Sequence, residues 1–520
     1  MSKDVVHVQS DSTTEETPLI NHKISESIAS GSLDIPHPHL VTNPRGIVYI
    51  CILLAILLQI GDQLMEVPFT RVYESIYCYK YWEVHDSSKL LQGRDVVGPG
   101  AIGGVSEALC KIPEVQADVA ALMGNLAFFN GIPSLLLAIP FGILADSWGR
   151  KPVILLGLSS FPLCAAWIMF VCWFWQFFDI RLIWLSSLHG IMGGSSTVVT
   201  ALFLTLLSDL VPEESRATVF LQTHAATLAM SFVIPPLAAS LMVIDPWIPL
   251  FSGLAALTFS IFLMYFIPET IHHHHASVSG TQQREPPEAE STRSTWIAPL
   301  KAMGRLLLSD WRVSGLIATF TFQSYSTSWT TVLLLQYAST RYRMSLTRAT
   351  FYVSLRAGFT VPICLALTPI VAKLLLSKFG YNAKQRDLVL AQALTVLTCF
   401  GWLLVALAPT IAMFVGSLLV LTLGCGYATF LRTVMTSLVA PSDVAKLYTV
   451  ISVVDTVGMM GGSPLFAWLF KVGLNIGDGG AGLPFCCLGI FYAACAGLAF
   501  CVRIRKTDRG EQIDEEFTEP

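Results

Sequence analysis

The chain has 520 residues, of which 53% are hydrophobic and only 13% are charged, and its formal net charge at pH 7 is −4. Because soluble globular proteins carry about a quarter charged residues, this composition excludes an ordinary soluble protein and indicates an integral membrane protein. The small net charge gives no sign of a nucleic-acid partner, and we expect none.

The chain starts with a polar segment, residues 1–45, which lacks the apolar core of a cleavable signal peptide. We expect this segment to be a cytosolic tail. The first apolar run, 46–68, is too long for a signal peptide and would itself direct the chain to the membrane. Within the tail, EETPLI at 15–20 fits an acidic dileucine sorting pattern. It keeps a vacuolar membrane open as an alternative to the plasma membrane, which we favour.

Apolar runs long enough to cross a membrane recur along the chain. A spanning helix needs about 20 apolar residues, and the sequence predicts twelve of them: 46–68, 119–144, 152–175, 180–207, 216–241, 246–267, 312–338, 349–376, 387–408, 410–434, 444–470 and 483–503. The expected fold class is therefore an all-α membrane protein.

Polar segments divide these helices into two sets of six. A loop at 69–118 follows the first helix, a polar and Pro-rich linker at 268–311 follows the sixth, and a short tail at 504–520 ends the chain. The linker contains four consecutive histidines, His272 to His275. We interpret them as part of a solvated linker, with a metal site as the alternative, and expect no metal and no cofactor.

The positions of lysine and arginine in the short loops predict the orientation in the membrane. On one side, which we assign to the cytosol together with both termini, lie Arg150, Lys151, Arg216, Lys378, Lys384, Arg386 and Lys446. One loop, 340–348, carries three arginines on the opposite side and disagrees. The loop 69–118 then becomes non-cytosolic, and its two cysteines, Cys78 and Cys110, are either paired or free.

A weak internal duplication relates the two sets of helices. The segment 208–220 follows the fourth helix and 437–450 follows the tenth, and the two align on Pro212 and Pro441. Two homologous halves of six helices are typical of transporters. We therefore expect two helical bundles, at 46–267 and 312–503.

The stretch GILADSWGRKP at 142–152 places charges and glycines between the second and third helices. It resembles the loop 2–3 signature of the major facilitator superfamily at Gly142, Asp146, Gly149, Arg150 and Lys151. The resemblance implies two pseudo-symmetric six-helix bundles that alternate access to a central site. It also implies that the stretch is a cytosolic latch. Gly142 would allow close helix approach, and Asp146 would contact a helix of the opposite half. A simple stop-transfer charge cluster is the alternative.

A narrower resemblance involves the first helix and the loop after it. A fungal branch of the superfamily, distantly similar to the proton-coupled folate transporter group, includes exporters encoded in metabolite gene clusters. The chain resembles it at Pro68, Arg71, Glu74, Cys78, Cys110, Lys111, Ile112, Val115 and Gln116. One feature departs from the superfamily, because Ser186 stands where the fourth helix carries an arginine linked to proton handling. That departure leaves the coupling mechanism open.

Ionisable residues inside the predicted helices are the candidates for a transport site. A charge in the bilayer core costs about 3 kcal/mol, so each should face protein or water. As proton-coupling candidates we take Asp455 first and Asp62 second, followed by His189 and His224. As substrate-binding or gating candidates we take Arg356, Arg432 and Glu66. Each candidate also has a structural alternative. Asp62 and Glu66 would belong to an external ion-pair lid, and both histidines would be helix-packing residues. Arg432 would form a structural ion pair.

Motifs of ATP-driven pumps and of common hydrolases are absent from the sequence, so we expect no enzyme. The sequence predicts a secondary active transporter that exports a small organic molecule and is driven by protons. Proton-coupled uptake is the first alternative, and a non-transporting receptor or a channel is the second. The expected partners are the small molecule, protons and the lipid bilayer, and we expect a monomer.

Overall fold

In the computed structural model, residues 44–502 are described apart from 92, 94–95, 270–310, 327–329, 380–381, 440–442 and 478. Most of the expected N-terminal tail (1–45) and linker (268–311), including His272 to His275, and all of the tail 504–520 lie outside the described residues. Within the described ranges every regular element is helical. All contacts given below lie within the single compact unit that starts at Arg45.

The N-terminal set contains six long membrane-crossing segments, one of which is interrupted. Its elements are α2 (Pro44–His85), η1 (Ser87–Lys89), η2 (Pro99–Ala101), η3 (Glu107–Cys110), α3 (Pro113–Trp148), α4 (Arg150–Trp173), η4 (Ile180–Leu188), α5 (His189–Gly193), α6 (Ser195–Leu210), α7 (Glu213–Ile244) and α8 (Trp247–Met264). The interruption separates α5 from α6 at Gly194, inside the predicted fourth span. There Ser195 has φ 75°, and its hydroxyl accepts a hydrogen bond from Ser134 of α3 at 2.7 Å.

The C-terminal set repeats this arrangement with more interruptions. Its elements are α11 (Trp311–Ala318), α12 (Thr330–Arg341), α13 (Leu346–Pro362), the π-helix η6 (Ile363–Leu367), α14 (Thr368–Phe379), α15 (Ala383–Leu407), α16 (Ile411–Leu423), α17 (Tyr427–Leu438), α18 (Val444–Ile476), η8 (Gly480–Gly482) and α19 (Leu483–Cys501).

Eleven described helices are long and apolar enough to cross a membrane, against the twelve predicted. The missing one is the predicted span 312–338, in which the structure gives α11 and α12 and, between them, the described stretch 319–326, which begins with turns at 319–322. This stretch is rich in serine and threonine, whose hydroxyls compete with the helical hydrogen bonds of the backbone. The sequence predicted the apolar run correctly, but it did not predict that the helix is interrupted.

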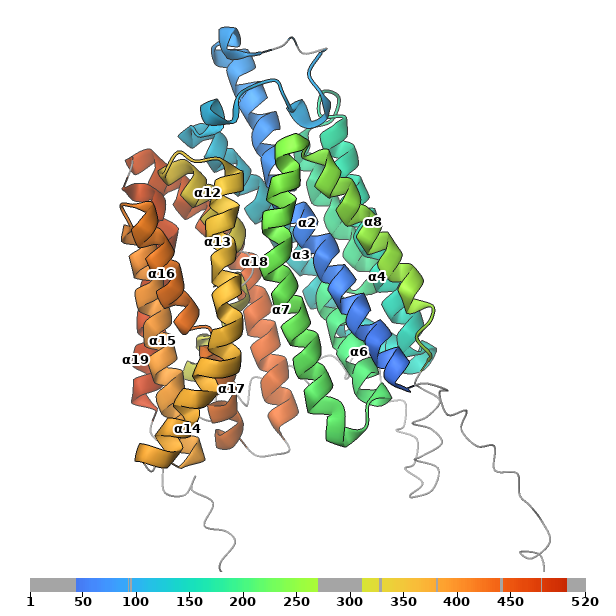
Figure 1. The fold of residues 1–520 in the computed structure, drawn as a ribbon, viewed down its shortest axis with the longest axis vertical. Coiled ribbons are helices and arrows are strands. Elements are labelled where there is room, and N and C mark those ends of the chain that lie inside the picture. The colour runs from blue at the N-terminus through green and yellow to red at the C-terminus, as the bar shows by residue number, and fades with distance from the viewer. Residues whose placement is uncertain are drawn as a thin grey trace, which may run out of the picture. The chain divides into compact units, whose positions relative to one another are not determined.

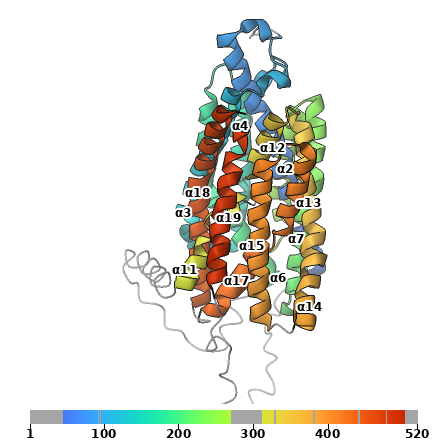
Figure 2. The same ribbon diagram turned by 90° about the vertical axis from the view of Figure 1, so that its left-hand side faces the viewer.

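The first helix is longer than predicted. The predicted span ended at residue 68 and left 69–118 as a loop, whereas α2 continues through Pro68 to His85. Residues spaced at helical intervals beyond Pro68, namely Val72, Tyr73, Ile76 and Tyr79, are almost fully buried. Figures 1 and 2 show this extension, in blue, projecting beyond the neighbouring helices. We call this end of the bundle, where Cys78 and Cys110 lie, the disulfide end, and the opposite end, with residues 142–152, the latch end.

The two sets of helices meet along two principal pairs, α3 with α18 and α7 with α13. Both pairs lie side by side in Figure 1, with α2 to α8 on one side and α12 to α19 on the other. Small residues permit the closest approach. A Cβ atom on Gly124 of α3 would lie 2.8 Å from the Ser463 carbonyl oxygen and 2.9 Å from Ala467 Cβ, both on α18.

Substituting Gly124→Leu should therefore lower stability by about 1–3 kcal/mol, the usual cost of overpacking a close contact. A lower melting temperature in detergent would report it. Gly416→Leu on α16 is the matched control, because a Cβ there would meet no atom within 4 Å. Equal melting temperatures for the two variants would show that the α3–α18 contact does not limit stability.

Candidate functional site

Three ionisable residues from opposite halves meet inside the membrane-spanning region. Asp62 and Glu66 lie one turn apart on α2, and their charges act on each other. The charge of Arg356, on α13 of the other half, acts on the Glu66 carboxylate. Asp62 is exposed at this level, whereas Glu66 and Arg356 are half-buried. The group therefore combines charges of both halves that act on one another with an exposed carboxylate.

Two thiols also lie near this site. Cys364 of the π-helix η6 and Cys425, which precedes α17, have their Sγ atoms 3.1 Å apart as free cysteines. Cys425 also lies close to Arg356. A π-helical turn frequently marks a functional position, and η6 brings Cys364 there.

Asp455 of α18 binds the interrupted seventh span. Its carboxylate accepts hydrogen bonds from the Ser324 backbone N–H at 2.8 Å and from the Ser324 hydroxyl at 2.5 Å. These contacts satisfy backbone and hydroxyl groups that the broken helix leaves free, which a membrane interior requires. Asp455 therefore has a structural partner that the sequence did not reveal, because the break itself was not predicted.

Arg432 of α17 holds the same stretch from another direction. Its Nη2 donates to the Gln323 Oε1 at 3.0 Å, and its guanidinium carbon lies 5.3 Å from the centre of the Phe320 ring. Opposite charges from α17 and α18 thus hold consecutive residues, Gln323 and Ser324. The side-chain hydrogen bond described for Arg432 is thus made to a neutral amide and not to a carboxylate.

Among the described residues, neither histidine makes a side-chain hydrogen bond with these charges. His189 begins α5, where its Nδ1 lies 2.8 Å from the Ser186 carbonyl oxygen and its ring lies 6.2 Å from that of Phe161. His224 on α7 is exposed, and no side-chain hydrogen bond of His224 is found among the described residues. The contacts of His189 are those of a helix-packing residue.

At the latch end, the signature residues contact their own half of the molecule. Arg150 forms an ion pair with Asp209 at the end of α6. The backbone N–H groups of Arg150 and Lys151, at the start of α4, donate to the Glu269 carboxylate at 3.2 and 3.0 Å. Gly149 has φ 110°, and a Cβ atom on it would lie 2.7 Å from Glu269 Oε2. A glycine here lets the carboxylate reach the positive N-terminus of the helix.

The other two signature positions make no such contacts in this state. The expectation that Gly142 allows a close helix approach is wrong for this structure, because a Cβ atom there would meet nothing within 4 Å. Asp146 is exposed, and among the described residues no hydrogen bond or ion pair joins it to the opposite half. The close contact of the signature is instead the one between Gly149 and Glu269.

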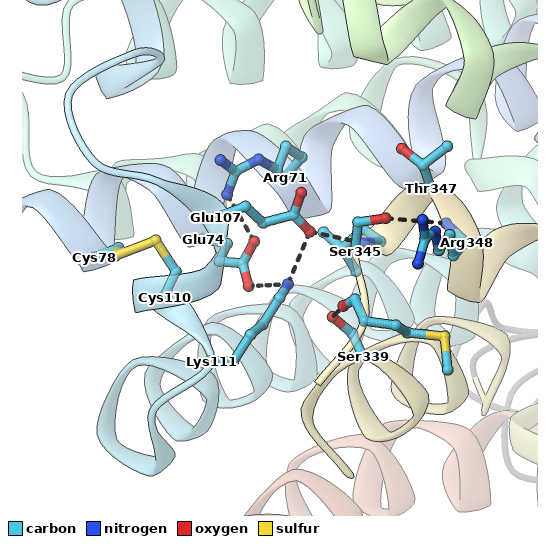
Figure 3. A network of polar contacts seen from close by, with 12 residues as sticks. Arg71, Glu74, Cys78, Glu107, Cys110, Lys111, Ser339, Ser345, Thr347 and Arg348 are labelled. Carbon is cyan, nitrogen blue, oxygen red and sulfur yellow. Dashed lines mark hydrogen bonds and ion pairs between the residues drawn. A yellow bond between two sulfur atoms is a disulfide. The ribbon is translucent and has the colours of Figure 1, made fainter. Parts of the chain in front are cut away.

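At the disulfide end, a network of charges surrounds Glu74 of α2 (Figure 3). The Glu74 carboxylate accepts hydrogen bonds from Arg71 Nη1 at 2.8 Å, Lys111 Nζ at 2.6 Å and Gln116 Nε2 at 2.6 Å. Cys78, one turn further along α2, is joined to Cys110 by a disulfide. Arg71 and Glu74 therefore form a site separate from Glu66, which is affected by Arg356 instead.

The network extends into the opposite half through Glu107 of η3. Lys111 Nζ lies 3.1 Å from Glu107 Oε1, and the same oxygen accepts the backbone N–H of Leu346, at the start of α13, at 2.7 Å. Burial raises the pKa of the Glu107 carboxyl, but the charges of Lys111 and Arg71 and the Leu346 N–H outweigh burial and leave that pKa below its ordinary value. Sequence reasoning missed Glu107, because nothing in the loop pattern shows its reach to α13.

An apolar cavity of about 810 Å³ lies between α3 and η4. Its lining includes Phe129, Leu136, Trp184 and Leu188, with Asp179 and Arg181 as the charged members. None of the intramembrane candidates lies in it. Among the described residues, no cluster of three or more His, Cys, Asp or Glu side chains has the geometry to hold a metal ion.

Comparison with known proteins identifies the relatives of this chain. The family model "Major Facilitator Superfamily" matches residues 112–463. The MFS efflux pump atnC of Emericella nidulans is 31% identical over 475 residues, which cover 89% of each chain. The MFS-type transporter aprT of Aspergillus flavus is 27% identical over 94% of each chain. A solved D-xylose-proton symporter superposes with a TM-score of 0.56 at 10% identity, covering 86% of this chain and 96% of the symporter.

Proposed function

The chain belongs to the major facilitator superfamily, and from this premise we propose that it exports a small organic molecule by alternating access, driven by protons. The chain is an integral multi-pass membrane transporter and not an enzyme. Export is supported by its similarity to fungal proteins named as efflux pumps, atnC and ustT. Uptake by the same machinery, and a closer kinship with the proton-coupled folate transporter group, remain proposals of second rank.

One observation carries the proposal: charges from the two halves, Glu66 and Arg356, act on each other within the membrane-spanning region. A pair shared between two moving halves is broken and remade as they separate, so it couples occupancy of the site to conformation. Arg356 would favour the ionised form of Glu66, and a proton or an anionic group of the substrate would compete for that interaction. Asp62, exposed beside them, would accept the proton from the open space.

The hydrogen bonds between the halves suggest which state is present. The described ones are Leu346 N–H to Glu107 at 2.7 Å, Thr347 to the Ala239 carbonyl at 3.5 Å, and Gln336 to Met123 Sδ at 3.9 Å. All three lie towards the disulfide end. We infer a state closed at that end and released at the latch end.

Asp455 would couple protons to the seventh span. As a carboxylate it accepts both hydrogen bonds of Ser324, and protonation would convert one acceptor oxygen into a donor and weaken that hold. The interrupted span would then be free to rearrange between α11 and α12. Proton binding at Asp455 would thus change the geometry of the C-terminal half.

We propose that the latch end and both termini are cytosolic and that the disulfide end faces outside. The disulfide Cys78–Cys110 supports this orientation, because disulfides persist in oxidising compartments. The plasma membrane is then the compartment that fits export, and we propose a monomer.

The test is deletion of the gene followed by metabolite and drug-sensitivity profiling, and then counterflow with the compound so identified. Purified protein in proteoliposomes preloaded with that compound should accumulate labelled compound without a driving force, because alternating access exchanges bound substrate. A channel would show no counterflow. Export rather than uptake predicts that the deletion strain retains the compound and is more sensitive to it.

Asp146→Asn should impair transport while expression and melting temperature stay at the wild-type level. The stability is unaffected because Asp146 is exposed in this state, but the latch that it forms in the outward-facing state is lost. Counterflow per milligram of reconstituted protein measures the effect. Wild-type counterflow in Asp146→Asn would remove the latch assignment.

A further inference from the structure

We propose that Glu107 is a gating residue of this transporter: it holds the two halves closed at the disulfide end, and acid on that side releases it. The structural unit, which we call the clasp, consists of Glu74, Glu107, Cys110 and Lys111 in the N-terminal half and the start of α13 at Leu346 in the other (Figure 3). The physiological meaning of the acid response, though not the closure itself, rests on the proposed function.

The base of the clasp is fixed to α2. The Glu74 side chain is 2% exposed and receives Lys111 and Gln116 at 2.6 Å each. Gln116 also donates to the Cys110 carbonyl oxygen at 2.9 Å, and Cys110 is bonded to Cys78. Charge-assisted hydrogen bonds in a buried position are strong and geometrically specific. Lys111 and the turn that carries Glu107 are therefore held in place.

The arm of the clasp is Glu107. Its Oε1 receives Lys111 Nζ at 3.1 Å from its own half and the Leu346 N–H at 2.7 Å from the other. Leu346 is the first residue of α13, where backbone N–H groups lack helical partners and the helix dipole favours a negative charge. Ser345 caps the Arg348 N–H of the same turn, so Glu107 completes the cap from across the interface. A separation of the halves at this end must break that bond.

The charges around Glu107 determine how it responds to pH. From its own half, Glu107 is faced by Lys111 and Arg71 and by the Glu74 carboxylate, which both of them contact. From the other half, α13 presents the Leu346 N–H and, in the same turn, the exposed Arg348. The net result is a pKa lowered from its ordinary value. A group whose pKa is lowered in the closed state stabilises that state above its ordinary pKa, about 4.3 for glutamate, and the contribution is lost as pH falls through the lowered value.

The clasp therefore stays closed at neutral and mildly acidic pH and opens in strong acid. In a proton-driven exporter the protons arrive from the side to which the substrate leaves. Acid that neutralises Glu107 would then favour opening towards that same side. The clasp links the availability of driving protons to the opening of the gate.

The test measures access to a residue that closure hides. Gln336 of α12 is 1% exposed and contacts Met123 of α3, so a cysteine in its place reports separation of the halves at this end. The reporter variant Gln336→Cys would be labelled with a membrane-impermeant maleimide added to the disulfide side. The rates are normalised at each pH to Val84→Cys, because Val84 is 80% exposed, and the labelling of the chain without a reporter cysteine is subtracted.

Combined with the reporter, Glu107→Ala should raise the labelling rate about tenfold at neutral pH, the population change expected when one charge-assisted hydrogen bond is lost. Glu107→Gln keeps an oxygen that can accept the Leu346 N–H, so its labelling rate at neutral pH should rise less than that of Glu107→Ala. Because glutamine does not titrate, the labelling rate of this variant should no longer increase in acid. Asp86→Asn is the matched control, because the side-chain contacts described for Asp86 lie within its own loop, with Ser88 and Lys89. It should follow the wild-type profile, which rises only in strong acid.

Two results would overturn the proposal. One is a labelling rate in Glu107→Ala equal to that of wild type at every pH. The other is an acid response in Glu107→Gln that matches the wild-type response. Melting temperatures near wild type show that the variants are folded. Labelling requires no substrate. A failure to find an exported compound would therefore count against the proposed function without changing the interpretation of the labelling experiment.

Discussion

Asp455→Asn should abolish proton-driven net flux of the transported compound while exchange without a gradient continues. The reason is chemical: asparagine cannot carry a proton, but its amide oxygen can still accept the Ser324 N–H that the carboxylate accepts at 2.8 Å. The interrupted seventh span is thereby kept in its geometry, and only the titration is removed. Net flux driven by an imposed pH gradient and counterflow in the same proteoliposomes separate the two effects.

Ser324→Ala is the matched control for this prediction. It removes the hydroxyl that donates to Asp455 at 2.5 Å and leaves the backbone N–H and the titratable carboxylate in place. We expect reduced rates of both net flux and exchange with the dependence on the pH gradient retained. If net flux in Asp455→Asn kept the wild-type dependence on the gradient, Asp455 would not be the coupling group, and its role would be limited to bracing the span.

The membrane-crossing pattern was readable from the sequence because it depends on a one-dimensional property, the length of an apolar run. The latch signature was readable for a similar reason, since its residue types and spacing lie within 142–152. What the sequence did not show was where each helix is interrupted or continues. Pro68 and the charges after it indicated an end to the first helix, yet tertiary burial of residues such as Tyr73 carries α2 on to His85.

Pairings across the fold were equally hidden from the sequence. Arg71 and Arg356 are both plausible partners for Glu66 by residue type, and only the structure shows that the Arg356 charge acts on Glu66 whereas Arg71 donates to Glu74. Glu269 was not among the predicted site residues, and its contact with the start of α4 spans more than a hundred residues. The same holds for Glu107 and Leu346. A single sequence gives candidates for such contacts but no distances.

The second prediction with a large expected effect concerns Glu66 and Arg356 and their contribution to stability. Arg356→Gln alone should destabilise the protein by about 1–3 kcal/mol, because it removes the positive charge that acts on the Glu66 carboxylate within the membrane. Glu66→Gln alone should be destabilising for the converse reason. The double variant Glu66→Gln/Arg356→Gln removes both charges and should recover most of the loss, since a neutral pair needs no compensation. Melting temperatures in detergent, combined as a double-mutant cycle, measure the coupling.

An exposed ion pair provides the comparison. Lys446 and Asp443 are 2.6 Å apart, with side-chain exposures of 50% and 35%, and Lys446→Gln should cost less than about 1 kcal/mol. Additive losses in the Glu66–Arg356 cycle would show that the two charges do not interact. Transport adds a second criterion, because a recovered fold need not recover function. If the charges only stabilise the fold, the double variant should transport as wild type does; if they are broken and remade in each cycle, it should be stable but inactive in net flux.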